Sequence, residues 1–463
     1  FSSEPKGILQ HPDVKREPDN EMLADFFLGM MTFADFSEDI NRSFFKNIFS
    51  LKPGNFAIFD NNGFKEKSYH KIEIPKDKDV KKDYAPLFRK TLDEAIKIRI
   101  PDEVKFGTAL SGGLDSSIVT ATIAKSGNDF IATSAKFQGN DENTDYHHAK
   151  ALSKKYDVKL IPTVITPKSL VAHIDAMIKA MDAPHDAMRQ LSLFLIYKLL
   201  KKEKRKVILV GEGADEFNLG YYHQMAGYEM DEKAIKSTAD FKNALIKRSK
   251  EASKFFTKEF LSGISFSAII DNNYLSYYNA TESKDPIEKI QFLHVKRFLK
   301  YRLDANDRCG MAHSIEARVP FCDKNVIKVS LSIPKNLNIS KDSEKNVEKQ
   351  AYQDLIPQEI LQRKKYPLPE SKNFEFYQLV NQELGQSIIS TDPKVWEILN
   401  KKFVVSINKE IGRKINSLKK SGQLGSALTS EIPISKPFEL RMKHIFAVLT
   451  LIRWYNMYFC DNE

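Results

Sequence analysis

The residues of this chain with the clearest capacity for chemistry lie in a short segment, SGGLDSS, at Ser111 to Ser117. The segment follows an apolar run and precedes a helical pattern, which predicts a turn from a strand into a helix. Glycines let such a turn curl so that successive amides point inward, and the positive end of the helix favours an anion there. Asp115 would repel a bare phosphate, so its presence predicts a bridging Mg²⁺ ion. The groups offered to a phosphate belong to Ser111, Gly112, Gly113, Ser116 and Ser117.

A second loop, GEGADE at Gly211 to Glu216, follows the apolar run KVILV. Loops at the carboxyl ends of parallel strands meet at one edge of a sheet, so we expect Asp215 to face Asp115 across one Mg²⁺-pyrophosphate ligand. The structural alternative is that both loops are ordinary helix starts, with acidic residues that complement the helix dipole. The chain has neither GxxxxGK[ST] nor GxGxxG after a strand, which argues against a P-loop phosphotransferase and a dinucleotide-dependent oxidoreductase.

Strand-like and helical runs alternate between residues 104 and 210, which predicts parallel βαβ units and a doubly wound α/β sheet. The expected strands are VKFGTAL, FIATSAKF, VKLIPTVI and KVILV. From Ala234 onward the apolar spacing is mainly helical. Near the start, NFAIFD followed by NNGF predicts a hairpin in a β-rich unit. We therefore expect a unit at 1–76 and a second at 77–463, with an α/β core over about 77–230 and a helical subdomain over about 231–463.

The composition is that of an ordinary globular protein, because 42% of the 463 residues are hydrophobic and 29% are charged. No apolar run is long enough to predict a membrane span. The net charge of +10 is spread among 61 acidic residues, which favours a solvated surface, while binding of a polyanion stays open. The three cysteines lack metal-site spacing, which favours a reducing, cytoplasmic setting, and Cys309 and Cys322 are expected to pack as small hydrophobes.

Further segments extend the pattern, and together they resemble the synthetase domain of the glutamine-dependent asparagine synthetase family. After SGGLDSS and before GEGADE comes FQGNDENTDYHHAKALSKKY, and the later matches are DRCGMAHSIEARVPFCD and EKNVEKQAYQDLIPQEILQRKKYPLP. The opening FSSEPKGIL and the later LKPGNFAIFD resemble the last strands of the family's N-terminal glutaminase, whose nucleophile is an N-terminal cysteine. The resemblance thus implies that 1–76 is the remnant of an Ntn-type glutaminase domain.

The resemblance implies an adenine nucleotide α-hydrolase-like fold of the PP-loop ATP pyrophosphatase type. It implies adenylation of the aspartate side chain by ATP with Mg²⁺, followed by attack of ammonia to give asparagine and AMP. By position, Leu110, Ala135, Val210 and Gly211 would contact ATP, with the SGGLDSS loop and Mg²⁺ at Asp115 and Asp215. The residues given catalytic roles are Glu212, Glu316, Arg363 and Lys365. Lys365 would neutralise charge on the α-phosphate. For Glu316 and Arg318 a buried ion pair that only joins the subdomain to the sheet stays open.

Three segments depart from the family pattern: FNLGYY, with Leu219 in place of a glycine, YPLPES after Lys365, and MDAPHDAMRQLS. They fall where the amino-acid substrate is expected, so other carboxylates stay open. Glu212 favours ammonia over β-lactam formation, but a lasso-peptide cyclase, a tRNA-modifying pyrophosphatase and a non-catalytic binding protein are further alternatives. The expected partners are small molecules, namely ATP, aspartate and ammonia or glutamine, without a membrane or nucleic acid. A homodimer is an open alternative.

Overall fold

A five-stranded parallel sheet lies at the centre of the α/β part of the chain. The computed structural model describes residues 1–30, 41–138, 144–186, 188–222, 237–363, 374–420 and 436–460. The strand order is β5-β4-β3-β6-β7, and every pairing in this sheet is parallel. The strands are β3 Phe106–Ala109, β4 Ile131–Phe137, β5 Lys159–Ile165, β6 Val207–Leu209 and β7 Glu316–Arg318. The chain runs outward from β3 to β5 and then returns to the other side of β3, which confirms the predicted doubly wound topology.

Helices on both faces bury the apolar side chains of this sheet. Alternate residues of β6 show the division, because Val207 and Leu209 belong to one apolar core and Ile208 belongs to the other. Each core therefore covers one face of the sheet. The helices between residues 84 and 222 are α3 Ala85–Lys97, α4 Leu114–Lys125, α5 Thr144–Lys155, α6 Pro167–Val171, α7 Ile174–Met181, α8 Met188–Lys202 and α9 Ala214–Asn218.

The fifth strand, β7, comes from a region that the sequence pattern assigned to helices. Its three residues pair with β6, with Val207 opposite Glu316 and Leu209 opposite Arg318. A run of three residues with two charges carries too little periodicity to be recognised as a strand. After β7 the chain adds α17 Lys324–Ser332, α18 Lys335–Asn338, α19 Asn346–Ala351 and α20 Gln358–Leu361, and α17 and α19 pack against α3. Residues 316 to 361 thus return to the α/β part, inside the range expected to be mainly helical.

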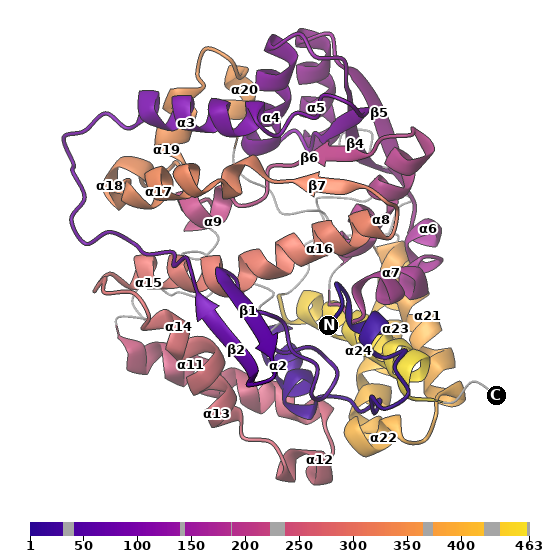
Figure 1. Ribbon diagram of the computed structural model, residues 1–463. Helices are drawn as coiled ribbons and strands as arrows, with labels where there is room; N and C mark the ends of the chain where they lie inside the picture. Colours follow the sequence, from indigo (N-terminus) through magenta and orange to yellow (C-terminus); the bar gives the residue numbers. More distant parts are fainter. Residues whose placement is uncertain are drawn as a thin grey trace.

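The remaining helices form the second part, which lies below the sheet in Figure 1 with α16 along the boundary. None of the helices that the structure describes combines the length and apolar character needed to cross a membrane. The helices are α11 Thr238–Ala252, α12 Lys258–Ser262, α13 Phe266–Ile270, α14 Ser276–Tyr278, α15 Pro286–Leu293, α16 Leu299–Met311, α21 Phe374–Ser390, α22 Val395–Ile398, α23 Lys401–Lys420 and α24 Lys436–Phe459. Short turns of other helix types are η1 Ser253–Phe255, η2 Asp271–Leu275, η3 His294–Phe298 and η4 Pro320–Cys322.

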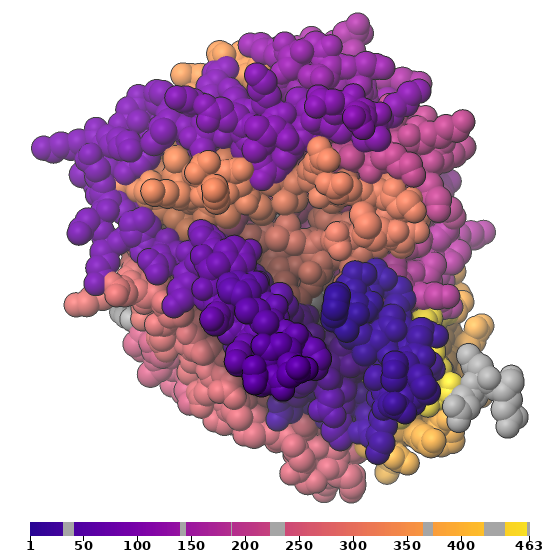
Figure 2. Space-filling view, in the orientation of Figure 1, coloured from indigo at the N-terminus to yellow at the C-terminus, as the bar shows by residue number. Residues whose placement is uncertain are grey.

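The N-terminal residues contain the predicted hairpin. Strands β1 Asn55–Asp60 and β2 Gly63–Ser68 are antiparallel, with Asp60 opposite Gly63, so the two asparagines between them form the turn. Several large apolar side chains of this hairpin are exposed, and Phe59 retains 84% of its accessible surface. Figure 2 shows the hairpin and the first residues on the same face of the molecule. This confirms a β-hairpin at the position that the sequence indicated.

The residues before the hairpin are part of the helical core. Besides the short α1 Pro5–Ile8, they form α2 Asn20–Met30, of which nearly every residue is buried. Asp25 of α2 pairs with Arg297 at 2.9 Å, and the Tyr274 hydroxyl and the Asn273 amide also donate to Asp25, each at 2.8 Å. Both charged side chains of this pair are almost completely buried. Within residues 1–30 and 41–50, the buried apolar side chains therefore share one core with residues 237 to 311.

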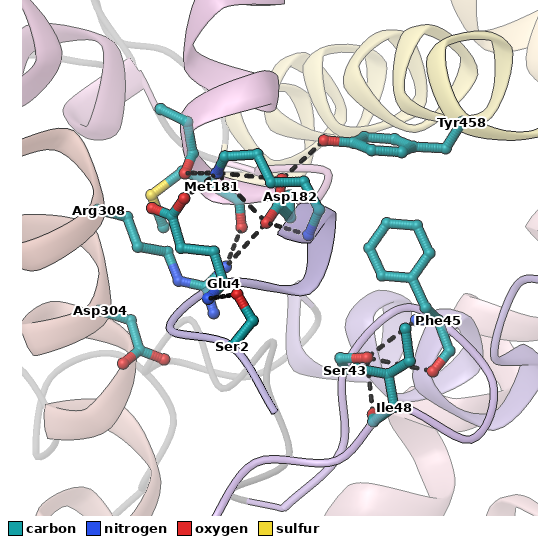
Figure 3. A network of polar contacts seen from close by, with 12 residues as sticks. Ser2, Glu4, Ser43, Phe45, Ile48, Met181, Asp182, Asp304, Arg308 and Tyr458 are labelled. Atoms are coloured by element: carbon teal, nitrogen blue, oxygen red, sulfur yellow. Dashed lines mark hydrogen bonds and ion pairs between the residues drawn. The ribbon is translucent and has the colours of Figure 1, made fainter. Parts of the chain in front are cut away.

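A second anchor of the N-terminal segment lies at Asp182, at the end of α7 (Figure 3). The backbone amide of Lys6 donates to Asp182 Oδ2 at 3.1 Å, and the Tyr458 hydroxyl of α24 donates to Oδ1 at 2.7 Å. Arg308 of α16 donates to the neighbouring carbonyl of Met181 at 2.6 Å. Asp182 thus joins the N-terminus, α7, α16 and α24 directly before the loop that leads to α8.

Candidate active site

The SGGLDSS loop lies between β3 and α4, as the sequence predicts. Ser111 and Ser116 hydroxyls are 2.9 Å apart, and the Ser116 hydroxyl also accepts from the Ser111 amide at 3.1 Å and donates to the Gly113 carbonyl at 3.2 Å. The amides in the first turn of α4 have no carbonyl partner within their own helix, which leaves donors for an anion. Ser117 is fully buried, whereas Ser111 is exposed. The structure therefore places Ser111 at the open side of the loop and Ser117 in the core.

Gly112 shows how tightly this loop is held. It adopts the left-handed conformation with φ of +78°, and a Cβ atom there would lie 2.2 Å from the Asp145 carbonyl oxygen. Arg363 Nη1 donates to the Gly112 carbonyl at 3.2 Å, and Nη2 of the same side chain pairs with the Asp145 carboxylate. Only glycine fits this position, because any side chain would meet α5. Arg363 thus contacts the loop backbone and α5, and it acts on the shape of the anion site.

The GEGADE loop follows β6 and turns into α9, beside the first loop. Val210 continues the sheet, since its amide donates to the Arg318 carbonyl at 3.0 Å. A Cβ atom on Gly211 would lie 3.0 Å from Asp115 Cβ, so the two loops are in close contact. The structure therefore brings Asp115 and Asp215 to one edge of the sheet, as the paired-loop interpretation requires.

The cation between these two aspartates is Lys345. Its Nζ lies 2.5 Å from Asp115 Oδ1 and 2.5 Å from Asp215 Oδ1, and only 7% of the side chain is exposed. Burial alone would lower the pKa of Lys345, but Asp115 and Asp215 outweigh that effect, so the pKa is raised and the side chain stays an ammonium. Two carboxylates around one cation are an arrangement that also suits a divalent ion.

Magnesium fits this pair better as a ligand held with phosphates than as an ion held by the protein alone. In the part of the chain that the structure describes, no group of three or more His, Cys, Asp or Glu side chains is arranged to hold a metal. Mg²⁺ in proteins is commonly bound through one or two carboxylates together with substrate phosphates. The ammonium of Lys345 shows that a cation is accommodated between Asp115 and Asp215. Bound there, Mg²⁺ would neutralise phosphate charge and orient the leaving pyrophosphate.

The other residues expected to contact ATP surround the same edge. Leu110 and Val210 have buried side chains, so only their backbone groups are left for a ligand. The Leu110 amide is already used, because it donates to the Thr133 carbonyl at 2.8 Å. Ala135 lies on β4 and is partly exposed. Contact with adenine through Ala135 stays a prediction.

Glu212 lies next to a basic side chain that the sequence did not single out. Arg189, in the first turn of α8, places Nη2 3.8 Å from Glu212 Oε1, and both side chains are partly exposed. Cys322 supports the loop from the other side, because its thiol donates to the Glu212 carbonyl at 3.7 Å. Burial raises the pKa of Cys322, and it raises the pKa of the buried Cys309 to about 12, so both thiols stay protonated. This agrees with the prediction that they pack as small hydrophobes.

One of the expected catalytic residues, Glu316, lies away from this cluster. Glu316 lies at the first residue of β7, beside the amino end of β6, whereas the two loops extend from the carboxyl ends of β3 and β6. Its carboxylate accepts from Arg318 Nε at 2.9 Å, and 56% of the side chain is exposed. The alternative of a buried ion pair that joins the subdomain to the sheet is therefore wrong, because Glu316 and Arg318 lie on the same edge strand and the Glu316 side chain is half in solvent. Lys365 lies outside the described residues, as do Gly139, Asp141 and Glu142.

Lys345, Glu348, Arg189 and Asp145 are the residues of this site that sequence reasoning missed. Lys345 and Glu348 fall in the segment EKNVEK, where alternating charges indicate a solvated surface. Both are buried instead, and burial raises the pKa of Glu348 well above its usual range. No local signal separates them from a surface helix, since their burial depends on a contact between segments more than 100 residues apart.

Comparisons with known proteins identify a matching family and several similar proteins. The asparagine synthase family model matches residues 87–416. Asparagine synthetase [glutamine-hydrolyzing] 3 of Bacillus subtilis is 28% identical over 428 residues, which cover 87% of this chain and 66% of that protein. Putative asparagine synthetase [glutamine-hydrolyzing] 1 of Methanocaldococcus jannaschii is 26% identical over 296 residues, covering 62% of this chain and 44% of that protein.

Among solved structures, the NH3-dependent NAD synthetase of Campylobacter jejuni is 17% identical and covers 48% of this chain and 96% of its own, with a TM-score of 0.25. That score is too low to carry an argument. The curated relatives are longer than this chain, which spans at most about two thirds of their length. The match of the family model over residues 87–416, with both loops inside it, shows that this chain belongs to the asparagine synthase family.

Proposed function

We propose that this chain forms an amide: it adenylates the side-chain carboxylate of aspartate with ATP, releases pyrophosphate, and lets ammonia displace AMP to give asparagine. The observation that carries the proposal is the convergence of Asp115 and Asp215 on one cation beside an anion-binding loop. An enzyme that releases pyrophosphate needs this arrangement, because the leaving group carries several negative charges that must be neutralised. In a longer protein the ammonia would come from glutamine.

The residues divide the work between holding phosphates and holding the amino acid. The amides and hydroxyls of the loop at Ser111 bind phosphate oxygens, and Arg363 keeps that loop in shape through the Gly112 carbonyl. Arg189 is the basic group nearest to Glu212, and it offers a carboxylate of the substrate a charge-assisted hydrogen bond. In this proposal, Glu212 accepts a proton from the incoming ammonia. Lys365 supplies charge to the α-phosphate as the acyl-adenylate forms and breaks.

The proposal is tested by measuring AMP and pyrophosphate release with ATP, aspartate and ammonium. Asp115→Asn and Asp215→Asn keep the size of each side chain but remove a negative charge, and each should lower turnover by about 10²- to 10³-fold, the usual loss for one preorganised electrostatic group. Asp13→Asn, at an exposed position on the N-terminal segment, is the matched control and should be unaffected. Wild-type turnover in either loop variant would refute the assignment of the two aspartates.

The identity of the substrate is tested in the same assay. AMP release that depends on both aspartate and ammonium supports asparagine formation. AMP release that requires neither, with another carboxylate or an internal amine as the acceptor, would instead support a cyclase. The purified chain should use ammonium and not glutamine as its nitrogen source.

A further inference from the structure

Lys345 is held in an unusual way for a lysine at the start of a helix. It is the N-cap residue of α19 and adopts the left-handed conformation, with φ of 56° and ψ of 39°. For a residue other than glycine, this backbone conformation costs roughly 1 kcal/mol or more and persists only where the surroundings impose it. The side chain is directed inward to Asp115 and Asp215 instead of outward to solvent. The chain therefore accepts both backbone strain and a buried charge at this position.

The residues around the Lys345 ammonium pack closely against it. A Cβ atom on Gly220 would lie 2.1 Å from Asp215 Oδ1 and 2.3 Å from Lys345 Cε, so the glycine provides the space in which these groups meet. On the other side, Glu348 is 1% exposed, and its Oε2 accepts from the Asn218 amide at 3.4 Å. The ammonium is thus enclosed by α9, α19 and the first turn of α4.

The two carboxylates in this pocket are stabilised in their charged forms by a cation between them. Two carboxylates that share one neighbour repel each other strongly when they lie in a medium of low dielectric constant, unless a positive charge separates them. A flexible lysine side chain can withdraw along its own length, whereas a divalent ion enters only from solvent. Asp115 Oδ1 and Asp215 Oδ1 therefore contact the lysine in the empty protein, and the same two oxygens would bind the metal once a nucleotide is present.

We propose that Lys345 is an internal counter-ion that occupies the metal position between Asp115 and Asp215 until the nucleotide arrives with its own Mg²⁺. In the empty protein the ammonium competes with free divalent ions for the two carboxylates, so the metal alone binds weakly. The metal enters when it is carried by the phosphates of ATP, because their charge compensates for the displaced ammonium. This inference rests on the proposed function for the identity of the nucleotide, but the competition itself concerns only the metal and the two aspartates.

The test uses Mn²⁺ alone as the probe, with the full chain and no nucleotide, and measures free Mn²⁺ by electron paramagnetic resonance. Lys345→Met keeps the length of the side chain and removes the charge, so the variant should bind Mn²⁺ at least about tenfold more tightly than the wild type. Lys345→Arg keeps the charge and should bind as weakly as the wild type. Lys349→Met is the matched control, because Lys349 lies on the same helix and donates to the Ser343 hydroxyl instead of to the aspartates.

A measurement of thermal unfolding with and without Mn²⁺ covers the case in which Lys345→Met is unstable. Removing the ammonium takes away the positive charge between Asp115 and Asp215, so the midpoint of unfolding should fall and should recover as Mn²⁺ is added, more than it does in the wild type. If Lys345→Met and Lys345→Gln bind Mn²⁺ no more tightly than the wild type, or unfold regardless of added Mn²⁺, the proposal is overturned. Failure of the proposed function would leave these results unchanged, since neither ATP nor aspartate is present.

Discussion

Arg297 and Lys345 are both buried cations that contact aspartate, but they differ in how fully their charge is balanced. Among the described residues, Arg297 pairs with the carboxylate of Asp25, and its other terminal nitrogen donates to the Asn273 carbonyl at 2.9 Å. Lys345 meets two carboxylates, with the buried Glu348 beside them. The first pair is close to neutral, whereas the second retains a negative charge.

The difference separates a structural contact from a binding site. A buried pair with one charge of each sign and further hydrogen bonds is stable as it stands, and it offers nothing to a ligand. A buried group with an excess of negative charge is incomplete without another cation, and it lies here at the edge of the sheet where ligands of doubly wound folds bind. The predictions below separate these two roles, beginning with the largest expected effect.

Removing one partner of the neutral pair should have the largest effect on stability. Asp25→Ala removes the carboxylate that pairs with the buried Arg297, and removing one partner of a buried ion pair costs about 3–5 kcal/mol of unfolding free energy. Urea denaturation measures the change. The double variant Asp25→Leu/Arg297→Met should recover much of the loss, because an apolar pair of similar volume does not pay for desolvation. If Asp25→Ala unfolds at the same urea concentration as the wild type, residues 20 to 30 are not part of this core.

The role proposed for Lys365 adds a third kind of cation to the comparison, one expected to act on the reacting atoms. Lys365→Ala should lower kcat by about 10²- to 10³-fold, the usual loss for one preorganised electrostatic group, with little change in thermal stability. Lys364→Ala is the control and should have almost no effect, because neighbouring lysines share a general surface potential but cannot share one phosphate geometry. Equal losses in both variants, or no loss in either, would show that the alignment of this segment is wrong.

The two glycine-containing loops at the edge of the sheet were predictable from the sequence, while the cation between them was not. SGGLDSS and GEGADE can be recognised from the local sequence, because each segment places glycine and acidic or hydroxyl residues directly after an apolar strand. Strand β7 was not predicted from the sequence, because its three residues, Glu316 to Arg318, form a strand only by pairing with β6. The roles of Lys345 and Arg189 were not predicted either. Their partners, Asp115 and Glu212, lie 230 and 23 residues away, so only folding brings each pair together. Local sequence patterns therefore predicted the loops at the edge of the sheet, whereas the cations beside them depend on contacts between distant segments.

The buried side chain of His185 shows how much burial of a titratable group changes the free energy of unfolding with pH. Burial lowers the pKa of His185 to about 3, so this side chain is neutral in the folded protein. The unfolded chain binds a proton near pH 6.5, so stability should fall as the pH is lowered below that value, by about 2.7 kcal/mol over two units for this one residue. His185→Gln should flatten the dependence by that amount, whereas His11→Gln, at an exposed position, should not. Urea denaturation between pH 4.5 and 7 checks the difference, and an unchanged slope in His185→Gln would contradict the assignment.

Arg189 is the test with the smallest expected effect, and it asks whether a partly exposed cation in the site belongs with Arg297 or with Lys345. Its guanidinium lies 3.8 Å from Glu212, which is too far for a strong hydrogen bond, so the pair contributes little to folding. If Arg189 instead awaits a carboxylate of the substrate, Arg189→Leu should raise the KM for aspartate about tenfold, the value of about 1.4 kcal/mol that one charged hydrogen bond supplies. The KM for ATP should stay the same, because in the proposed mechanism the loop at Ser111 holds the phosphates.

Lys198→Met, later on the same helix and exposed, controls for the general loss of positive charge. An equal rise in both KM values would assign Arg189 to the nucleotide, and a fall in stability without any change in KM would assign it to the structural class of Arg297.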